Sequence, residues 1–259
     1  ITSMVGVPTL FIDMLHHARA DRYDLSSLVA CSSGGAKLPV PVLEAFEQKF
    51  GVVVYEGYGL TETSPVLTVN PHGDPRAGSV GLPLPEVELE IRDQDATGVG
   101  ELYARGPTIM AGYYHNEEAT RAVLSDGWFR TGDLCHRDSE GFVYVSGRTK
   151  DVIVTAAGKN VYPDEVAAHY ARLPHVKEMS VLAMPNADGI GDRVDAVIVL
   201  DLESVADVDR SAVEAEIREA VARVSDKIPS HQRVEKIHFR TKDLPRTTTL
   251  KVKRAELVC

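Results

Sequence analysis

The sequence has 259 residues, 44% of them hydrophobic and 25% charged, which is the composition of a globular protein with one large domain or two of moderate size. With 38 acidic and 28 basic residues, its formal charge of -10 argues against nucleic acid or an anionic membrane as the main partner. No apolar run approaches the ~20 residues of a membrane span, and the three cysteines and nine histidines lack zinc, disulfide or metalloprotease spacing, so a reducing, cytoplasmic setting is expected.

Helix and strand patterns alternate in the first part of the chain. Apolar residues at near-helical spacing follow Pro8 and predict an amphipathic helix there. A buried-strand pattern at Leu28–Cys31 ends in the glycine-marked stretch Ser32–Ala36. A second helix, stopped by Gly51, leads to the β-branched run Val52–Val54, which predicts the next strand. Strand, helix and strand in this order favour parallel pairing, so both strand ends should face the same side of a sheet.

The stretch Tyr55–Pro65, YEGYGLTETSP, follows that second strand and is interpreted as a nucleotide-facing loop. Its glycines permit a tight backbone path, and ligands bind beyond the carboxyl ends of strands in open α/β sheets. Tyr58 could offer a ring face to a base, while Thr61 and Glu62 could offer oxygens to a metal-bound phosphate. On composition alone, a strand exit with Thr61 capping the next segment is an equally good interpretation.

From about Asn70 to Ser146, prolines and glycines punctuate short alternating runs, which predicts antiparallel β structure. The stretch Asp126–Asp133 is expected to interrupt this structure and to bury two aromatic residues. Asp133 could accept both hydroxyls of a ribose, although taken alone it is more simply a turn residue.

The charged turn Gly147–Asp151 is predicted to mark a domain boundary. A helix with acids in its first turn starts at Pro163. Two strands, a second helix and a further strand complete a small α+β module, and they are expected at Val176–Met184, Val194–Leu200, Ser211–Val224 and Val234–Phe239. The last segment, Leu244–Arg254, is polar, basic and irregular before a short closing helix, and alone it would be interpreted as a solvated basic tail.

The predicted fold class is therefore α/β with α+β. We expect a truncated large domain at residues 1–149, with a parallel-sheet portion at about 1–68 and an antiparallel β subdomain at about 69–149. A small, mobile α+β domain should follow at residues 150–259.

Six stretches, in order and at the family's approximate separations, resemble the AMP-forming acyl-CoA synthetases, or fatty-acid-CoA ligases, of the adenylate-forming superfamily. That superfamily includes luciferases and peptide-synthetase adenylation domains. The stretches are SSGGAKL from Ser32, YGLTETSP from Tyr58, GELYARGPTIMAGYY from Gly100, DGWFRTGD from Asp126, GRTKDVIVTAAGKNVYPDEV from Gly147 and LPRTTTLKVKR from Leu244.

The resemblance implies roles for individual residues in the first 149 positions. Gly34, Gly35 and Ala36 match the strand-end loop beside adenine and the acyl group, and Tyr58 matches the ring against adenine. Thr61 matches the hydroxyl that contacts phosphate, and Glu62 matches the magnesium carboxylate. Asp133, together with Arg148, matches the pair that holds the ribose.

For the small domain, the resemblance implies a rotation between two positions, one for each half-reaction. Lys150 falls at the family's hinge, Gly158 in the loop that lines the pantetheine tunnel, and Lys251 at the mobile lysine of adenylation. Leu250 stands where the family usually has glycine, so the loop that presents Lys251 is expected to follow a different path. The implied cofactors are ATP, Mg²⁺ and coenzyme A, and the implied substrate is a fatty acid or another carboxylic acid.

The family's phosphate loop, rich in glycine, serine and threonine, is absent from these residues. We therefore expect the carboxy-terminal half of a synthetase that is inactive alone in pyrophosphate exchange, and activity above a Lys251→Ala control would contradict this. Two alternatives stay open: an adenylation enzyme that loads a carrier-protein thiol, and a non-catalytic nucleotide-binding fragment. Trapping products with each thiol acceptor separates the first, and titration with AMP tests the second.

Overall fold

The computed structural model describes residues 1–186, 189–201, 209–247 and 252–257. The chain divides into two compact units, Ile1–Ser146 and Gly147–Cys259, each of which is described by itself. The predicted division between residues 149 and 150 stays a prediction. Within the described ranges, no helix is long and apolar enough to cross a membrane.

The first unit starts with a five-stranded sheet in the order β1-β2-β3-β4-β5. Its strands are β1 (Ser3–Gly6), β2 (Ala30–Ser33), β3 (Val53–Gly59), β4 (Val66–Val69) and β5 (Leu82–Pro83). The first three strands pair in parallel, which confirms the predicted pairing of β2 with β3, and β4 and β5 add to them antiparallel.

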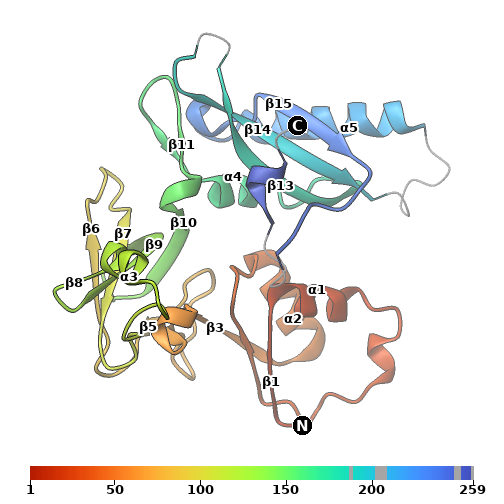
Figure 1. Ribbon diagram of the computed structural model, residues 1–259. Coiled ribbons are helices and arrows are strands. Elements are labelled where there is room, and N and C mark those ends of the chain that lie inside the picture. The colour runs from red at the N-terminus through yellow and green to blue at the C-terminus, as the bar shows by residue number, and fades with distance from the viewer. Residues whose placement is uncertain (187–188, 202–208, 248–251, 258–259) are drawn as a thin grey trace. The chain divides into compact units, whose positions relative to one another are not determined.

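Two helices, α1 (Pro8–His16) and α2 (Val40–Phe50), pack together beside this sheet (Figure 1). Phe11 of α1 meets Phe46 of α2 edge to face, with their ring centroids 5.1 Å apart, and both rings are fully buried. Gly51 ends α2 in the left-handed conformation, which needs a residue without a Cβ. Cys31 of β2 and Val54 of β3 belong to the same buried core as these two rings.

A second sheet of the first unit has the order β10-β9-β7-β6, with β8 paired to β9. Its strands are β6 (Glu88–Arg92), β7 (Gly100–Arg105), β8 (Leu124–Ser125), β9 (Trp128–Arg137) and β10 (Val143–Arg148). The short helix α3 (Glu117–Val123) leads into β8 and lies beside β9 (Figure 1). The antiparallel β subdomain predicted for this region is present.

The second unit is the small α+β module that the sequence predicts. It contains a two-stranded sheet, β11 (Ile153–Val154) and β12 (Asn160–Val161), and a three-stranded sheet in the order β13-β14-β15, formed by Val176–Pro185, Asp192–Leu200 and Lys236–Arg240. The helices are α4 (Pro163–His169) and α5 (Arg210–Ser225), and α5 lies along the three-stranded sheet (Figure 1). Apolar residues of both helices and of β13 and β14 form one core.

Two predictions about strand limits are wrong. The strand predicted at Val52–Val54 continues through Gly57 to Gly59, because β4 pairs antiparallel with β3 and matches Tyr58 with Thr68. In the predicted interruption at Asp126–Asp133, only Asp126 and Gly127 form a turn, and β9 begins at Trp128. Of its two aromatic residues, only Phe129 is buried, and Trp128 stays half-buried.

Trp128 is half-buried because cations cover it: the guanidinium groups of Arg92 and Arg105 lie 5.2 and 4.7 Å from its ring centroid. Since β9 continues to Arg137, Asp133 lies inside a strand and not in a turn. The simpler interpretation of Asp133 as a turn residue is therefore also wrong.

Candidate active site

A buried threonine shapes the loop after β3. Thr63, fully buried in the short 3₁₀ turn Thr61–Thr63, accepts a hydrogen bond from the Leu60 amide at 2.9 Å through its hydroxyl. The same hydroxyl lies 2.6 Å from the Pro65 carbonyl oxygen, to which it donates. Satisfying the polar groups of a tight turn in this way fixes the backbone, so the neighbouring Thr61 and Glu62 start from defined positions.

The phenol of Tyr58 joins this loop to the second sheet. It donates a hydrogen bond of 2.6 Å to Oδ2 of Asp133, whose exposed fraction is only 7%. Burial, followed by the nearby charge of Asp133, raises the pKa of Tyr58 well above its ordinary value of 10.0, so the phenol keeps its proton and acts as a donor. Asp133 is also held by its own amide, which donates to Oγ1 of Thr131 at 3.1 Å. The structure thus brings together two predicted site residues that lie far apart in the sequence.

Glu62 is held at both its main chain and its side chain. Its carbonyl oxygen accepts a hydrogen bond of 2.9 Å from the Met110 amide, and its Oε1 accepts one of 2.8 Å from the Tyr113 hydroxyl. The side chain of Glu62 is only half-buried, and Thr61 beside it is exposed. Both residues can therefore meet a ligand that enters from solvent.

Magnesium fits the oxygen donors of this loop. A carboxylate and a hydroxyl are hard donors, and Mg²⁺ usually takes one or two protein oxygens and completes its shell with phosphate and water. Across the described ranges, no three His, Cys, Asp or Glu side chains gather into a group that could hold a metal ion.

The glycine loop after β2 lies at the same end of the sheet. Ser33 is in register with Glu56 across the parallel pair, so Gly34, which follows β2, lies beside Gly57, which continues β3. The Gly34 amide donates to the Gly6 carbonyl oxygen at 3.1 Å, and Gly35 has a φ of 82°. Gly35 and Ala36 are exposed, as a loop that contacts a ligand requires.

A buried carboxyl group fastens this loop. Oε1 of Glu56 accepts a hydrogen bond of 3.0 Å from the Leu38 amide, and Glu56 is 3% exposed. Burial raises the pKa of Glu56, although the amide hydrogen bond and the charge of Lys37 oppose the shift. Oε2 has no hydrogen-bond partner among the described residues.

The predicted residues of the second unit lie on three different segments. Arg148 is half-buried at the end of β10, and Lys150 is exposed in the 3₁₀ turn Thr149–Asp151. Gly158 is exposed in the turn between β11 and β12, with a φ of 69°. Lys251, like Leu250, lies outside the described residues, so its predicted role and the predicted effect of Leu250 stay predictions.

The two sides of the segment that contains Lys251 are anchored. On one side, Glu178 accepts from the Leu244 amide at 2.8 Å and pairs with the Arg246 guanidinium. On the other, Arg254 pairs with Asp151 and Asp164 and donates to the Val181 carbonyl oxygen at 3.2 Å. An antiparallel β-bridge pairs Arg246 on the first side with Val252 on the second.

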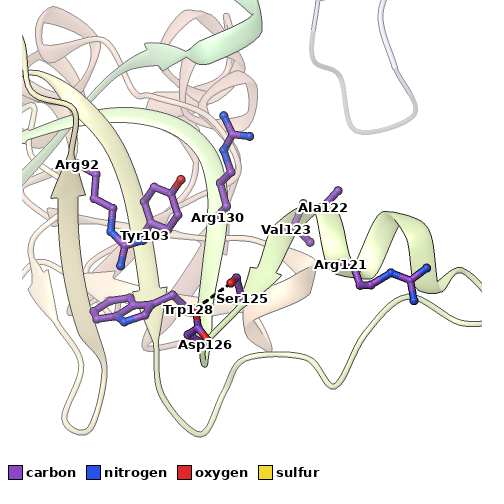
Figure 2. A pocket seen from close by; sticks show the side chains of 9 residues that line it. All are labelled: Arg92, Tyr103, Arg121, Ala122, Val123, Ser125, Asp126, Trp128 and Arg130. Atoms are coloured by element: carbon purple, nitrogen blue, oxygen red, sulfur yellow. Dashed lines mark hydrogen bonds between the residues drawn. The ribbon is translucent and has the colours of Figure 1, made fainter.

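A separate cavity of about 530 Å³ lies on the second sheet and includes none of the predicted site residues (Figure 2). Arginine and aromatic side chains line part of it, but Arg121 points away from Arg92 and Arg130 in Figure 2. Those two guanidinium groups are also paired, with Glu90 and Glu101 respectively. The cavity is therefore not the predicted nucleotide site.

Sequence reasoning missed the residues that hold the site together. Glu56, Thr63 and Tyr113 contact predicted site residues or the loops that carry them, but none was singled out. Tyr113 lies in the quoted stretch GELYARGPTIMAGYY, which is a local signal, yet its partner Glu62 is far away in the sequence. Only the fold brings such residues together.

Comparison with known proteins identifies close relatives of the whole chain. The family model described as AMP-binding enzyme matches residues 1–114, and the one described as AMP-binding enzyme C-terminal domain matches residues 165–251. A long-chain-fatty-acid–CoA ligase of Bacillus subtilis is 36% identical over 99% of this chain and 45% of its own length. The chain thus spans about half the length of the curated relatives it matches.

Two solved structures share the fold over 99% of the chain. ATP-bound MatB from Rhodopseudomonas palustris is 32% identical, with a TM-score of 0.84 and 50% of that chain covered. O-succinylbenzoate coenzyme A synthetase from Bacillus subtilis, in complex with ATP and a magnesium ion, is 28% identical, with a TM-score of 0.79 and 51% covered.

Proposed function

Because the chain belongs to the family of AMP-binding enzymes, we propose that it forms the adenylate-binding and domain-alternating part of an AMP-forming fatty-acyl-CoA synthetase. The reaction converts a carboxylic acid and ATP into an acyl adenylate and pyrophosphate, and then transfers the acyl group to the thiol of coenzyme A. Because the chain covers 45% of the B. subtilis ligase, the activity is proposed for a protein of the relatives' full length.

The observation that carries the proposal is the joint placement of Tyr58, Asp133 and Glu62 in the first unit. Tyr58 lies near the end of β3 and Glu62 in the turn that follows it, and the Tyr58 hydroxyl donates to Asp133 of the second sheet at 2.6 Å. We assign the ring of Tyr58 to adenine and the carboxylate of Asp133, with Arg148, to the ribose hydroxyls. The exposed loop Gly34–Ala36 receives the edge of adenine and the acyl group.

In the first half-reaction, the substrate carboxylate attacks the α-phosphorus of ATP, and pyrophosphate leaves. Two anions must approach each other, so positive charge at the developing transition state lowers the barrier. Lys251 is assigned that role, and the Thr61 hydroxyl is assigned to the phosphate. Glu62 would hold Mg²⁺, which supplies charge neutralisation to the phosphates.

In the second half-reaction, the thiol of coenzyme A attacks the acyl carbonyl carbon, and AMP leaves with the oxygen that bridged it to the acyl group. A pantetheine arm needs a narrow channel, and the Gly158 turn can line it without a side chain. Lys150, exposed in the turn Thr149–Asp151, is assigned to the hinge about which the small domain alternates.

The choice of a fatty acid and of coenzyme A rests on the relatives. The B. subtilis relative is a long-chain-fatty-acid–CoA ligase, and both structural relatives, which have the same fold, contain bound ATP. Loading of a carrier-protein thiol uses the same adenylate and stays the alternative for the second step.

Pyrophosphate exchange and product trapping test this function. The protein encoded by the complete gene should exchange labelled pyrophosphate into ATP only when a fatty acid and Mg²⁺ are present, and coenzyme A should yield an acyl thioester and AMP. Acyl transfer to a carrier protein but not to coenzyme A would replace the proposed acceptor. Failure of all acids to support exchange would contradict the proposed function.

A further inference from the structure

The segment between β7 and α3 forms hydrogen bonds with Glu62 at two points. The Met110 amide donates to the Glu62 carbonyl oxygen at 2.9 Å, and the Tyr113 hydroxyl donates to Oε1 of the same residue at 2.8 Å. Neither contact is local in the sequence. A flexible glutamate side chain that would otherwise sample several rotamers is thus tied at its tip and at its backbone.

The backbone that presents Tyr113 is itself fixed. The Tyr113 amide donates to Oγ1 of Thr120 at 2.9 Å, and that hydroxyl donates to the Asn116 carbonyl oxygen at 2.8 Å. Asn116 caps α3 by accepting from the Ala119 amide at 3.0 Å. Gly112 allows the close approach, because a Cβ at that position would lie 2.9 Å from Cγ2 of Thr120. The Tyr113 ring is therefore delivered by a prearranged loop.

The carboxylate of Glu62 has two oxygens, and the Tyr113 hydroxyl donates its hydrogen bond to Oε1. We propose that Tyr113 is a positioning residue for Glu62: by donating to Oε1, it fixes the carboxylate so that the other oxygen meets the divalent cation that accompanies the nucleotide. This inference rests on the proposed function, in which Glu62 is the metal carboxylate. It predicts that loss of the phenol weakens cation binding, whereas a phenol that merely competed with the cation would give the opposite sign.

Direct cation binding tests the proposal without turnover. Mn²⁺ serves as the probe, titrated by electron paramagnetic resonance against the protein encoded by the complete gene with α,β-methylene ATP present. Tyr113→Phe should raise the Mn²⁺ dissociation constant about threefold to tenfold, the range expected for one lost hydrogen bond to a charged group near solvent. Metal-free nucleotide affinity should stay at the wild-type value.

Tyr114→Phe is the matched control, because Tyr114 is the next residue, is 90% exposed and packs on His115. It should bind Mn²⁺ as the wild type does. Thr120→Val removes the hydroxyl that fixes the Tyr113 backbone and should weaken Mn²⁺ binding in the same direction as Tyr113→Phe. This second variant keeps the test valid if the first does not fold.

The outcomes separate this inference from the function on which it rests. Mn²⁺ binding that is unchanged or tighter in Tyr113→Phe and Thr120→Val overturns the inference, as does equal weakening in the Tyr114→Phe control. If Glu62→Gln loses Mn²⁺ while Tyr113→Phe keeps it, the inference is wrong and the metal role of Glu62 stands. If Glu62→Gln binds Mn²⁺ normally, the metal assignment in the proposed function is wrong.

Discussion

Two carboxyl groups of the first unit are buried beside the proposed site, and different donors hold them. Glu56 accepts from the Leu38 main-chain amide, and Asp133 accepts from the phenol of Tyr58. Both groups are at most 7% exposed, so the hydrogen bonds offset part of the cost of desolvation. Substitutions at the two sites should change stability in opposite directions: Glu56→Gln should gain stability relative to the wild type as the pH rises, whereas Tyr58→Phe should lose it.

Glu56→Gln should remove the pH-dependent free-energy cost of ionising a buried carboxyl group. Because the pKa of Glu56 is raised from 4.5, the folded state binds the proton more tightly than the unfolded state. This contribution to stability is full below pH 4.5 and is lost as the pH rises from 4.5 through the raised pKa. Urea unfolding from about pH 4 to about pH 8 should therefore show the variant gaining stability relative to the wild type.

The exposed Glu44 on α2 provides the matched control for this series. If Glu44→Gln and Glu56→Gln shifted the free energy of unfolding in the same way with pH, burial would not be the cause.

Tyr58→Phe should lose a hydrogen bond to a buried carboxylate. We expect the free energy of unfolding to fall by about 1 to 2 kcal/mol, and AMP affinity measured by calorimetry to fall as well, since Asp133 loses its orientation. Tyr23→Phe is the control, because Tyr23 is 65% exposed. A loss of stability without a loss of AMP affinity would leave Tyr58 a structural role only.

At the scale of elements, the turn between β3 and β4 determines whether the site forms. The two strands pair so closely that a Cβ on Gly59 would lie 1.7 Å from the Pro65 carbonyl oxygen. At Gly34 the nearest atom to a Cβ is the Gly57 carbonyl oxygen at 3.8 Å, which is an ordinary contact.

Gly59→Ala should therefore lower the free energy of unfolding by about 3 kcal/mol or more, because backbone has to move. Gly34→Ala should cost at most about 1 kcal/mol. Chemical denaturation of both variants measures the difference. Equal stability of the two would mean that the turn accommodates a side chain at Gly59.

Arg254 has a comparable position in the second unit. It joins the turn that contains Asp151 to the first turn of α4 at Asp164, at the base of the segment that carries Lys251. Arg254→Met should lower the free energy of unfolding by about 1 to 3 kcal/mol, because it leaves partly buried carboxylates without their partner. The control Arg223→Met removes an exposed pair with Glu219 and should change it by at most about 0.5 kcal/mol. Similar costs for both would contradict the anchoring role.

The sequence was sufficient for elements with a strong local pattern. The helices α1, α2, α4 and α5 and the strands β13 and β14 follow from apolar spacing, prolines at helix starts and the glycine after α2. The path of β3 beyond Gly57 and the strand β9 did not follow, because strand pairing and not local composition decides both. Pairing with β4 and β7 overrides the glycines and the turn-like composition.

At the scale of the whole molecule, the residue types of the site could be predicted and their supports could not. Tyr58, Glu62 and Asp133 stand in recognisable stretches, but the bond between Tyr58 and Asp133 and the bond between Tyr113 and Glu62 each cross between separate parts of the chain. The chain divides into two compact units, and the proposed function assigns the alternation between the two half-reactions to movement of the second one. An acyl adenylate as the intermediate between the two half-reactions is the central element of the proposed function.

Lys251→Ala tests the alternation by separating the half-reactions. In the complete protein, the variant should lose acid-dependent pyrophosphate exchange and keep thioester formation from supplied acyl adenylate, since the proposed function has the lysine neutralise charge only in the first step. Product analysis by mass spectrometry measures both steps. An equal loss of both would assign Lys251 another role or indicate damage to the fold.

The acyl adenylate itself is tested most directly by the fate of the acid's oxygen. The complete protein is supplied with ATP, Mg²⁺, coenzyme A and a fatty acid whose carboxylate carries oxygen-18. Because a carboxylate oxygen attacks the α-phosphorus and leaves with it, the account predicts one labelled oxygen in AMP and none in pyrophosphate. Unlabelled AMP, or label in inorganic phosphate formed together with ADP, would contradict it.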